Sequence, residues 1–148
     1  MQKAYRYFVS LIIVGMMLVA CSKGGTDTSG DEGSGNPHVD SPSDTTAPVV
    51  IINTPVPDQV YTSGTIINVT GRITDDFGLY RGTVRITNDA NGALLKEQQY
   101  EIHGLLAYNF NISYTTAVTA VSDYTVRVTF EDHGNNTASR SVKVKVNP

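Results

Sequence analysis

The feature that most constrains this chain is a two-residue alternation of apolar and polar side chains, which recurs from about residue 47 onward. In residues 65–75, Ile67, Val69 and Ile73 alternate with polar side chains, and residues 123–132 repeat the pattern. Successive side chains of a β-strand point to opposite faces, so each such segment has one apolar face. No segment of this region sustains an apolar stripe at the helical period of about 3.6 residues. The region is therefore predicted to be all-β.

The alternating segments are separated by turn-forming residues, such as the Asn-Gly-containing hairpin turn at 88–92. Many short strands over about 100 residues are typical of a two-layer antiparallel sandwich. Lys143 and Lys145 in the last segment suit a sheet edge, where charge discourages pairing with another chain. The seven predicted strands cover residues 48–52, 65–75, 80–87, 94–102, 105–114, 123–132 and 141–146.

The first twenty residues have a different character. Lys3 and Arg6 precede an apolar run over residues 8–20, which is interrupted only by Ser10 and Gly15. A positive start, a short apolar run and a small final residue are the parts of a secretory signal peptide. A helix that spans a bilayer needs about 20 apolar residues, so an uncleaved membrane anchor is the less favoured alternative. Residues 1–20 are therefore predicted to be a signal peptide.

The apolar run ends at Cys21, the only cysteine of the chain. The sequence Leu18-Val19-Ala20-Cys21 resembles the lipobox of bacterial lipoproteins, in which the cysteine sulfur receives diacylglycerol before cleavage. This resemblance implies a mature chain that begins at lipidated Cys21 and uses the membrane as its partner. Several acyl chains, at about 0.8 kcal/mol per buried CH₂, hold a protein durably on a bilayer. The expected location is the cell envelope, with the outer membrane favoured.

Removal of residues 1–20 takes away Lys3 and Arg6 and no acidic residue, so the net charge moves from −3 to −5. An acidic chain without a dominant basic stretch is a poor ligand for nucleic acid. With Cys21 lipidated, no cysteine is left for a disulfide, and the fold must depend on its core alone. Nucleic acid is therefore excluded as an expected partner.

Residues 22–46 are rich in Gly, Ser, Thr and Asp, and Val39 is their only aliphatic residue. Such a segment cannot bury enough apolar surface to offset the entropy of ordering, so it is predicted to be a disordered tether. As a flexible coil it would span about 25–30 Å. The expected organisation is a signal peptide at 1–20, a lipidated cysteine with a flexible linker at 21–46, and a β domain at 47–148.

The β domain resembles the immunoglobulin-like domains of bacterial surface proteins. The resemblance rests on "DTTAPVV" at 44–50, "VTGRITDDFGL" at 69–79 and "SDYTVRVTFEDHGNN" at 122–136. It implies an immunoglobulin-like or fibronectin-III-like sandwich on a Bacteroidota-type lipoprotein of the cell envelope. The antibody pattern of two cysteines and a tryptophan is absent, because the domain contains neither residue type.

Catalytic motifs are not found. The β domain holds only His103 and His133 as histidines, and no serine lies in a recognisable nucleophile motif. Adjacent carboxylates such as Asp75 and Asp76 point to opposite faces if they lie on a strand, which disfavours an acid/base pair. We expect no enzymatic activity. Two alternatives stay open: a binding or adhesion module for a glycan or an envelope protein, and a structural spacer or accessory subunit with no ligand.

The first candidate binding site is a basic sheet face. In an immunoglobulin-like order the third, sixth and seventh predicted strands lie side by side, with their cations pointing outward. An anionic glycan or an acidic partner could dock there, and the alternative is a solvated face with cross-strand ion pairs. The residues of this predicted ligand face are Arg81, Arg85, Arg127, Lys143 and Lys145.

The second candidate site is an acidic pole. The loops after the second and sixth predicted strands lie at one end of such a sandwich, together with the start of the first strand. Calcium favours six to eight oxygen ligands, and the resemblance extends to immunoglobulin-like repeats that bind calcium at this pole. No other cofactor is expected, and the alternative is that these residues simply form turns. The candidate calcium ligands are Asp44, Asp75, Asp76, Asp132 and Asn135.

Overall fold

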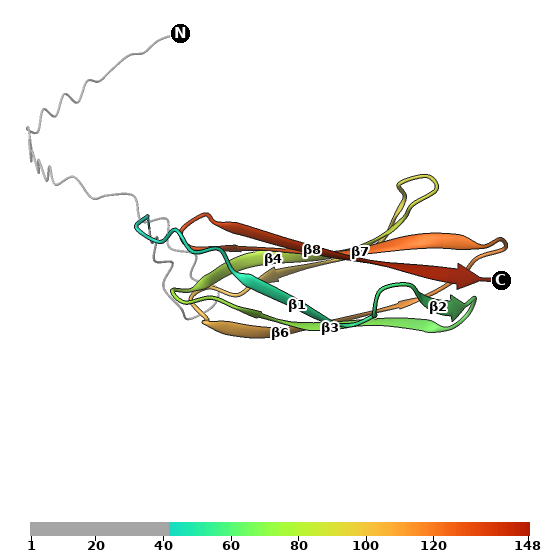
Figure 1. Ribbon diagram of the computed structural model, residues 1–148, viewed down its shortest axis with the longest axis horizontal. Coiled ribbons are helices and arrows are strands. Elements are labelled where there is room, and N and C mark those ends of the chain that lie inside the picture. Colours follow the sequence, from blue (N-terminus) through green and yellow to red (C-terminus); the bar gives the residue numbers. More distant parts are fainter. Residues whose placement is uncertain (1–41) are drawn as a thin grey trace, which may run out of the picture.

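The computed structural model describes residues 42–148, which form two β-sheets that lie face to face (Figure 1). The predicted signal peptide, Cys21 and most of the predicted tether lie outside these residues. The described chain starts at one end of the sandwich, and its C-terminus lies at the other end (Figure 1). The strands are β1 (Val49–Thr54), β2 (Gln59–Thr62), β3 (Ile66–Thr74), β4 (Leu79–Asn88), β5 (Leu94–Glu101), β6 (Ala107–Thr115), β7 (Ser122–Asp132) and β8 (Thr137–Asn147).

One sheet has three strands in the order β1-β3-β6, and the other has five in the order β2-β8-β7-β4-β5. The side-by-side placement of β4, β7 and β8 confirms the predicted adjacency of these three strands. All neighbours run antiparallel except β2 and β8, which are parallel. The all-β, immunoglobulin-like sandwich is thus confirmed. No helix in residues 42–148 is long and apolar enough to cross a bilayer.

The strand count differs from the prediction, because β2 adds an eighth strand and a parallel pair to the predicted seven antiparallel ones. β1 ends at Thr54, since Pro55 has no N–H to donate to a ladder, and the Thr54–Pro55 peptide is cis. The chain then crosses to the other sheet, where Gln59–Thr62 pairs with the end of β8. A four-residue strand is too short to display an alternation, so the pattern could not reveal it. The prediction that Lys143 and Lys145 lie on a sheet edge is therefore wrong, because β2 pairs with the outer side of β8.

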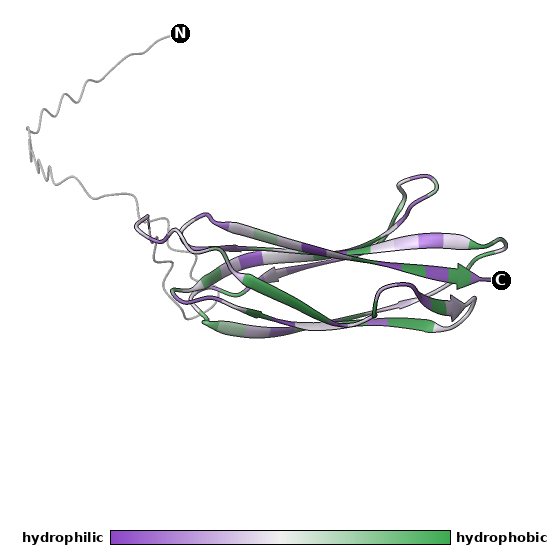
Figure 2. Ribbon diagram, in the orientation of Figure 1, coloured by the Kyte–Doolittle hydropathy of each residue, from purple (hydrophilic) through white to green (hydrophobic). Residues whose placement is uncertain are grey.

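Alternation along the strands produces the core. Figure 2 shows hydrophobic and hydrophilic bands that alternate along β8, whereas β1 is hydrophobic over most of its length. The inward side chains of β3, β4, β6, β7 and β8 are buried between the sheets. The largest of the fully buried side chains are Tyr124, Phe110, Phe130, Ile67, Ile73, Leu79 and Ile86.

Two phenylalanine rings at the centre of the core lie against glycines of neighbouring strands. Phe110 is paired with Gly71 of β3, and Phe130 is paired with Gly82 of β4. A methyl carbon on Gly82 would lie 2.1 Å from Cδ1 of Phe130, and one on Gly71 would lie 2.2 Å from Cζ of Phe110. Each ring therefore occupies the space that a side chain on the adjacent strand would need. The two rings, one from each sheet, stack with their centroids 6.2 Å apart and connect the sheets.

Candidate functional site

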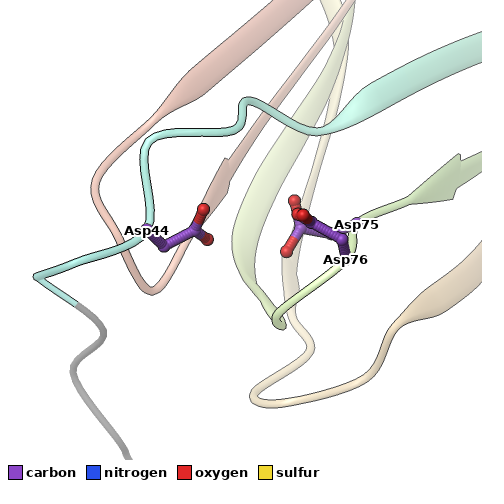
Figure 3. Close-up of side chains that lie close together, drawn as sticks. All are labelled: Asp44, Asp75 and Asp76. Atoms are coloured by element: carbon purple, nitrogen blue, oxygen red, sulfur yellow. The ribbon is translucent and has the colours of Figure 1, made fainter.

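The structure brings three of the five candidate calcium ligands together at one end of the sandwich, which we call the acidic pole. Asp44 lies at the start of the described chain, and Asp75 and Asp76 follow β3 (Figure 3). One carboxylate oxygen of each residue lies within 4.8 Å of the others. The carboxylate of Asp44 faces those of Asp75 and Asp76 across the gap between the two chain segments (Figure 3).

In Asp44 and in Asp75, one of the two carboxylate oxygens accepts hydrogen bonds from backbone N–H groups of the residue's own turn. Asp75 Oδ2 accepts hydrogen bonds from the backbone N–H groups of Phe77 at 3.0 Å and Gly78 at 2.6 Å. Asp44 Oδ1 accepts one from the N–H of Thr46 at 2.9 Å. The second oxygens, Asp44 Oδ2 and Asp75 Oδ1, are buried and accept no hydrogen bond from any group in residues 42–148. Buried carboxylate oxygens without a donor are costly, and a hard cation is the kind of ligand that would satisfy them.

Asp132 and Asn135 do not join this cluster. Asp132 is buried, as its inward position on β7 predicts, but its carboxylate organises its own loop. Oδ1 accepts from the N–H groups of Gly134 at 2.7 Å and Asn136 at 2.8 Å, and Oδ2 accepts from Asn136 Nδ2 at 3.0 Å. Asn135 is exposed and has a φ of 65°, the conformation that the turn requires. Both residues therefore serve the turn in this structure.

Asn136 connects this turn to the acidic pole. Its Nδ2 group also donates to the backbone oxygen of Asp44 at 3.1 Å, so one amide links the β7–β8 loop to the start of the domain. Gly134 also lies close to Asp44, because a methyl carbon on Gly134 would be 2.7 Å from the backbone oxygen of Asp44. Asn136 is not among the residues predicted from the sequence. The sequence feature that marks this residue is the Asn-Asn pair after Gly134, and only the second of these side chains points into the loop.

An aromatic stack lies at the same end of the five-stranded sheet. The ring centroids of Tyr80 and His133 are 4.9 Å apart, and those of Tyr80 and His103 are 5.0 Å apart. Both histidines are buried, and His103 Nε2 lies 3.5 Å from a carboxylate oxygen of Glu101. The backbone N–H of His133 donates to Gly78 O at 3.1 Å, and this hydrogen bond ties the β7–β8 loop to the loop that carries Asp75.

The predicted ligand face is the outer face of the five-stranded sheet, and all five of its cations are exposed there. Four of the five are paired with carboxylates. The ion pairs are Arg81 with Glu131 at 3.1 Å, Arg85 with Glu97, Lys143 with Asp89 at 2.9 Å, and Lys145 with Asp123 at 2.8 Å. The face is therefore closely balanced in charge, as expected for a solvated face with cross-strand pairs.

Hydrogen bonds and neighbouring charges shift several pKa values on this face. The hydrogen bond from the Thr125 hydroxyl, with help from Lys143, lowers the pKa of Asp89. The hydrogen bond from Arg85 lowers the pKa of Glu97. Arg127 stands directly opposite Arg85 and donates to Ser139 Oγ at 3.1 Å. Within residues 42–148 it is the one cation of the predicted ligand face without a carboxylate in an ion pair.

A polar groove of about 270 Å³ lies on the same outer face, toward the acidic pole. Its walls come from four adjacent strands, because the register sets Arg81 beside both Glu101 and Glu131, and Thr83 beside both Gln99 and Thr129. The guanidinium of Arg81 lies 4.8 Å from the ring centroid of Tyr80, which holds it at the end of the groove. The lining residues are Arg81, Gly82, Thr83, Gln99, Glu101, Thr129, Phe130, Glu131 and Thr137.

Of the residues that line this groove, the predicted ligand face contains only Arg81. The other polar residues share its outward parity on their strands, but only the register reveals that Gln99 and Thr83 lie side by side. Hydroxyl and amide groups therefore line part of the groove, while one cation and two carboxylates lie side by side at its end toward the acidic pole. This composition suits an uncharged polar ligand better than an anion.

No family model matches this chain, and no curated protein matches it significantly. Among solved structures it is similar to fibronectin(III)-like modules of CbhA from Clostridium thermocellum, with 17% identity and a TM-score of 0.44 over 68% of this chain and 47% of that chain. Spo0M, a sporulation control protein from Bacillus subtilis, shows 10% identity and a TM-score of 0.45 over 69% and 49% of the two chains. This chain thus spans about half the length of either protein.

The CARDB domain of the PF1109 protein from Pyrococcus furiosus, solved in complex with di-metal ions, is also similar. It shows 18% identity and a TM-score of 0.41 over 69% of this chain and 96% of that chain. At this level of identity, these similarities indicate nothing about activity or ligands. The chemistry of the groove and of the acidic pole must therefore come from the residues themselves.

Proposed function

We propose that this protein is a lipid-anchored envelope protein whose immunoglobulin-like sandwich binds a neutral, hydroxyl-rich ligand such as a glycan. The observation that carries the proposal is the groove of about 270 Å³ on the five-stranded sheet. Sugar hydroxyls both donate and accept hydrogen bonds, and the hydroxyl and amide groups of Thr83, Gln99 and Thr129 do the same. The groove sits on regular strands, which hold these side chains in place.

The charge balance favours a neutral ligand over the anionic one that the basic face suggested. Within the groove, Arg81 is already paired with Glu131, and Glu101 adds a second negative charge. An anion would have to displace these carboxylates or lie against them. A structural spacer without a ligand is the alternative function.

The proposed anchor rests on the sequence before the described residues. Leu18-Val19-Ala20-Cys21 follows a short apolar run, and the described domain begins after a Gly- and Ser-rich segment. Lipid on Cys21 would hold the sandwich on the envelope membrane, and the segment between them would give the domain reach.

A second proposal is that the acidic pole binds calcium through Asp44, Asp75 and Asp76. The buried oxygens Asp44 Oδ2 and Asp75 Oδ1, which accept no hydrogen bond from residues 42–148, support it. Oxygen donors of this kind match a hard cation, with backbone oxygens and water as further ligands. Bound calcium would fasten the start of the domain to the β3–β4 loop and so limit the angle between tether and sandwich.

The groove is tested by titrating the chain with neutral glucose tetrasaccharides, one α-linked and one β-linked, and with anionic tetragalacturonate. We expect at least one neutral probe to bind and to shift the amide signals of Thr83 and Gln99 in NMR spectra. Gln99→Ala should weaken that binding about five-fold, the value of one lost hydrogen bond. The matched control Gln98→Ala, one residue away, should bind as the wild type does.

Equal weakening by Gln98→Ala and Gln99→Ala would contradict the groove as the binding site. Binding of tetragalacturonate alone, abolished by Arg85→Glu and Arg127→Glu, would return the function to the basic face. If none of the probes bound, the structural spacer would be the better description of the protein.

The anchor is tested by Cys21→Ala, with Ser22→Ala as the control. In detergent phase separation, the wild type and Ser22→Ala should enter the detergent phase, because acyl chains carry them there. Cys21→Ala should move to the aqueous phase or persist as an uncleaved precursor. Cys21→Ala that is processed and retained like the wild type would show that the protein is not a lipoprotein.

Calcium binding is tested by thermal unfolding in millimolar calcium and in chelator. A ligand of the folded state stabilises it by about 2.7 kcal/mol at 100 times its Kd, so the wild-type melting temperature should rise in calcium. Asp76→Asn should remove most of that rise, whereas Asp58→Asn at the other pole should keep it. Asp132→Asn should lower the melting temperature in both buffers and retain the rise. Identical wild-type melts in the two buffers would leave only the turn function of these aspartates.

A further inference from the structure

β6 lies at an open edge of the three-stranded sheet. One side of it pairs with β3 in an unbroken register from Ile66↔Thr115 to Thr74↔Ala107. The even-numbered residues that flank β6 form hydrogen bonds with the β3 side, since Asp75 N–H donates to Leu106 O and Thr116 N–H donates to Thr65 O. Backbone groups alternate in direction along an antiparallel strand, so the odd-numbered residues of β6 present theirs to the open side. No strand within residues 42–148 pairs with that side.

The other three edge strands carry features that discourage pairing with another chain. β1 has a register shift between Ile52 and Thr54 and is followed by Pro55, and β2 has only four residues. β5 carries three charged side chains, Lys96, Glu97 and Glu101. β6 has none of these features, because its sequence AYNFNISYT contains no charge, proline or bulge. Proteins generally protect long edge strands, so an edge of nine residues without any of these features calls for a partner strand.

We infer that β6 pairs with β6 of a second copy of this chain, antiparallel and about a two-fold axis at Asn111. In this register Asn111 faces Asn111 of the second copy, and Asn109 faces Ser113. The odd-numbered residues on each side then exchange their open backbone N–H and C=O groups in reciprocal pairs. The two three-stranded sheets become one continuous sheet in the order β1-β3-β6-β6-β3-β1. This inference is independent of the proposed ligand and anchor.

The side chains of β6 are self-complementary in this arrangement. Its outward residues Asn109, Asn111, Ser113 and Thr115 are all exposed and uncharged, so pairing brings no like charges together. The Asn–Ser pair that would form across the axis already exists within the chain. Ser113 Oγ donates to Asn68 Oδ1 at 2.7 Å, and these two residues are directly paired between β3 and β6. Isologous pairing of this kind is the commonest symmetry of soluble oligomers.

For this pairing to form, Tyr100 of β5 must give up a hydrogen bond to the open edge. Its hydroxyl donates to the backbone oxygen of Asn111 at 3.3 Å, at the centre of the open edge. The ring packs against Tyr108 and Phe130, so it is held over the edge from the neighbouring sheet. The N–H of Asn111 from the second copy would replace the Tyr100 hydroxyl on this oxygen. One hydrogen bond is thus exchanged for another when the strands meet.

The register is tested by cysteine cross-linking of the full chain in whole cells that express it. Asn111→Cys places two thiols opposite each other at about 5.5 Å between Cα atoms, within the range of a disulfide. Asn109→Cys alone places the two Cα atoms of residue 109 roughly 14 Å apart, because residue 109 faces residue 113 and the two thiols are offset by four residues. After mild oxidation we expect a dimer band for Asn111→Cys at least about ten times stronger than for Asn109→Cys or Ser113→Cys. Co-expression of Asn109→Cys with Ser113→Cys should restore the dimer band. The wild type, which retains Cys21, controls for any disulfide through that residue.

A charge on the edge supplies the second test. Asn111→Lys, a change at an exposed position, places two like charges on the axis and should reduce the dimer fraction at least about ten-fold in sedimentation velocity. Asn53→Lys on β1, at the opposite edge of the same sheet, should sediment as the wild type does. The inference is overturned if the wild type is monomeric at every concentration, even if another protein binds β6. It is also overturned if Asn111→Cys cross-links no better than Asn109→Cys.

Discussion

The sandwich depends on two phenylalanine rings that occupy the space left by two strand glycines. Phe110 covers Gly71 within one sheet, and Phe130 covers Gly82 within the other, while the two rings meet between the sheets. A glycine in a strand normally weakens it, but here the neighbouring ring supplies the missing packing. Because a shift of one residue would place a side chain where each ring lies, the contacts also fix the register of β3 with β6 and of β4 with β7.

A fixed register determines what each outer face presents. On the five-stranded sheet it sets cations opposite carboxylates and collects hydroxyl and amide groups in one groove. On the three-stranded sheet it gives β6 a neutral outward row of amides and hydroxyls. The two faces therefore differ in chemistry although one core supports both. We propose ligand binding for the first face and self-pairing for the edge of the second sheet.

The acidic pole joins the sandwich to the residues that precede it. The carboxylate of Asp132 accepts three hydrogen bonds within the β7–β8 loop. Asn136 of this loop in turn donates a hydrogen bond to the backbone oxygen of Asp44. The side chain of Asp44 is thereby held close to Asp75 and Asp76. The first residues of the domain are thus positioned by its far end in sequence. A cation bound there would strengthen a connection that hydrogen bonds already make.

The sequence predicted the long strands, the adjacency of β4, β7 and β8 and the outward direction of all five basic side chains, because alternation records which face each residue occupies. It missed β2, since four residues cannot display a period. It also missed Asp89 and Asp123 as the partners of Lys143 and Lys145, because these pairs form only through the register of separate strands. For Asp132 the parity indicated burial, but a local pattern does not say which donors a carboxylate meets.

The most direct test of the central contact is a double-mutant cycle on Gly82 and Phe130, measured by urea unfolding of the mature chain. All three of the nearest atoms to a methyl carbon on Gly82 belong to the Phe130 ring, at 2.1, 2.3 and 2.4 Å. Gly82→Ala should cost about 1–3 kcal/mol in the wild type, as overpacking does. In the Phe130→Leu background the same change should cost at least about 1 kcal/mol less, because the ring is no longer there. An equal cost in both backgrounds would contradict the claim that this ring and this glycine hold the sheet in register.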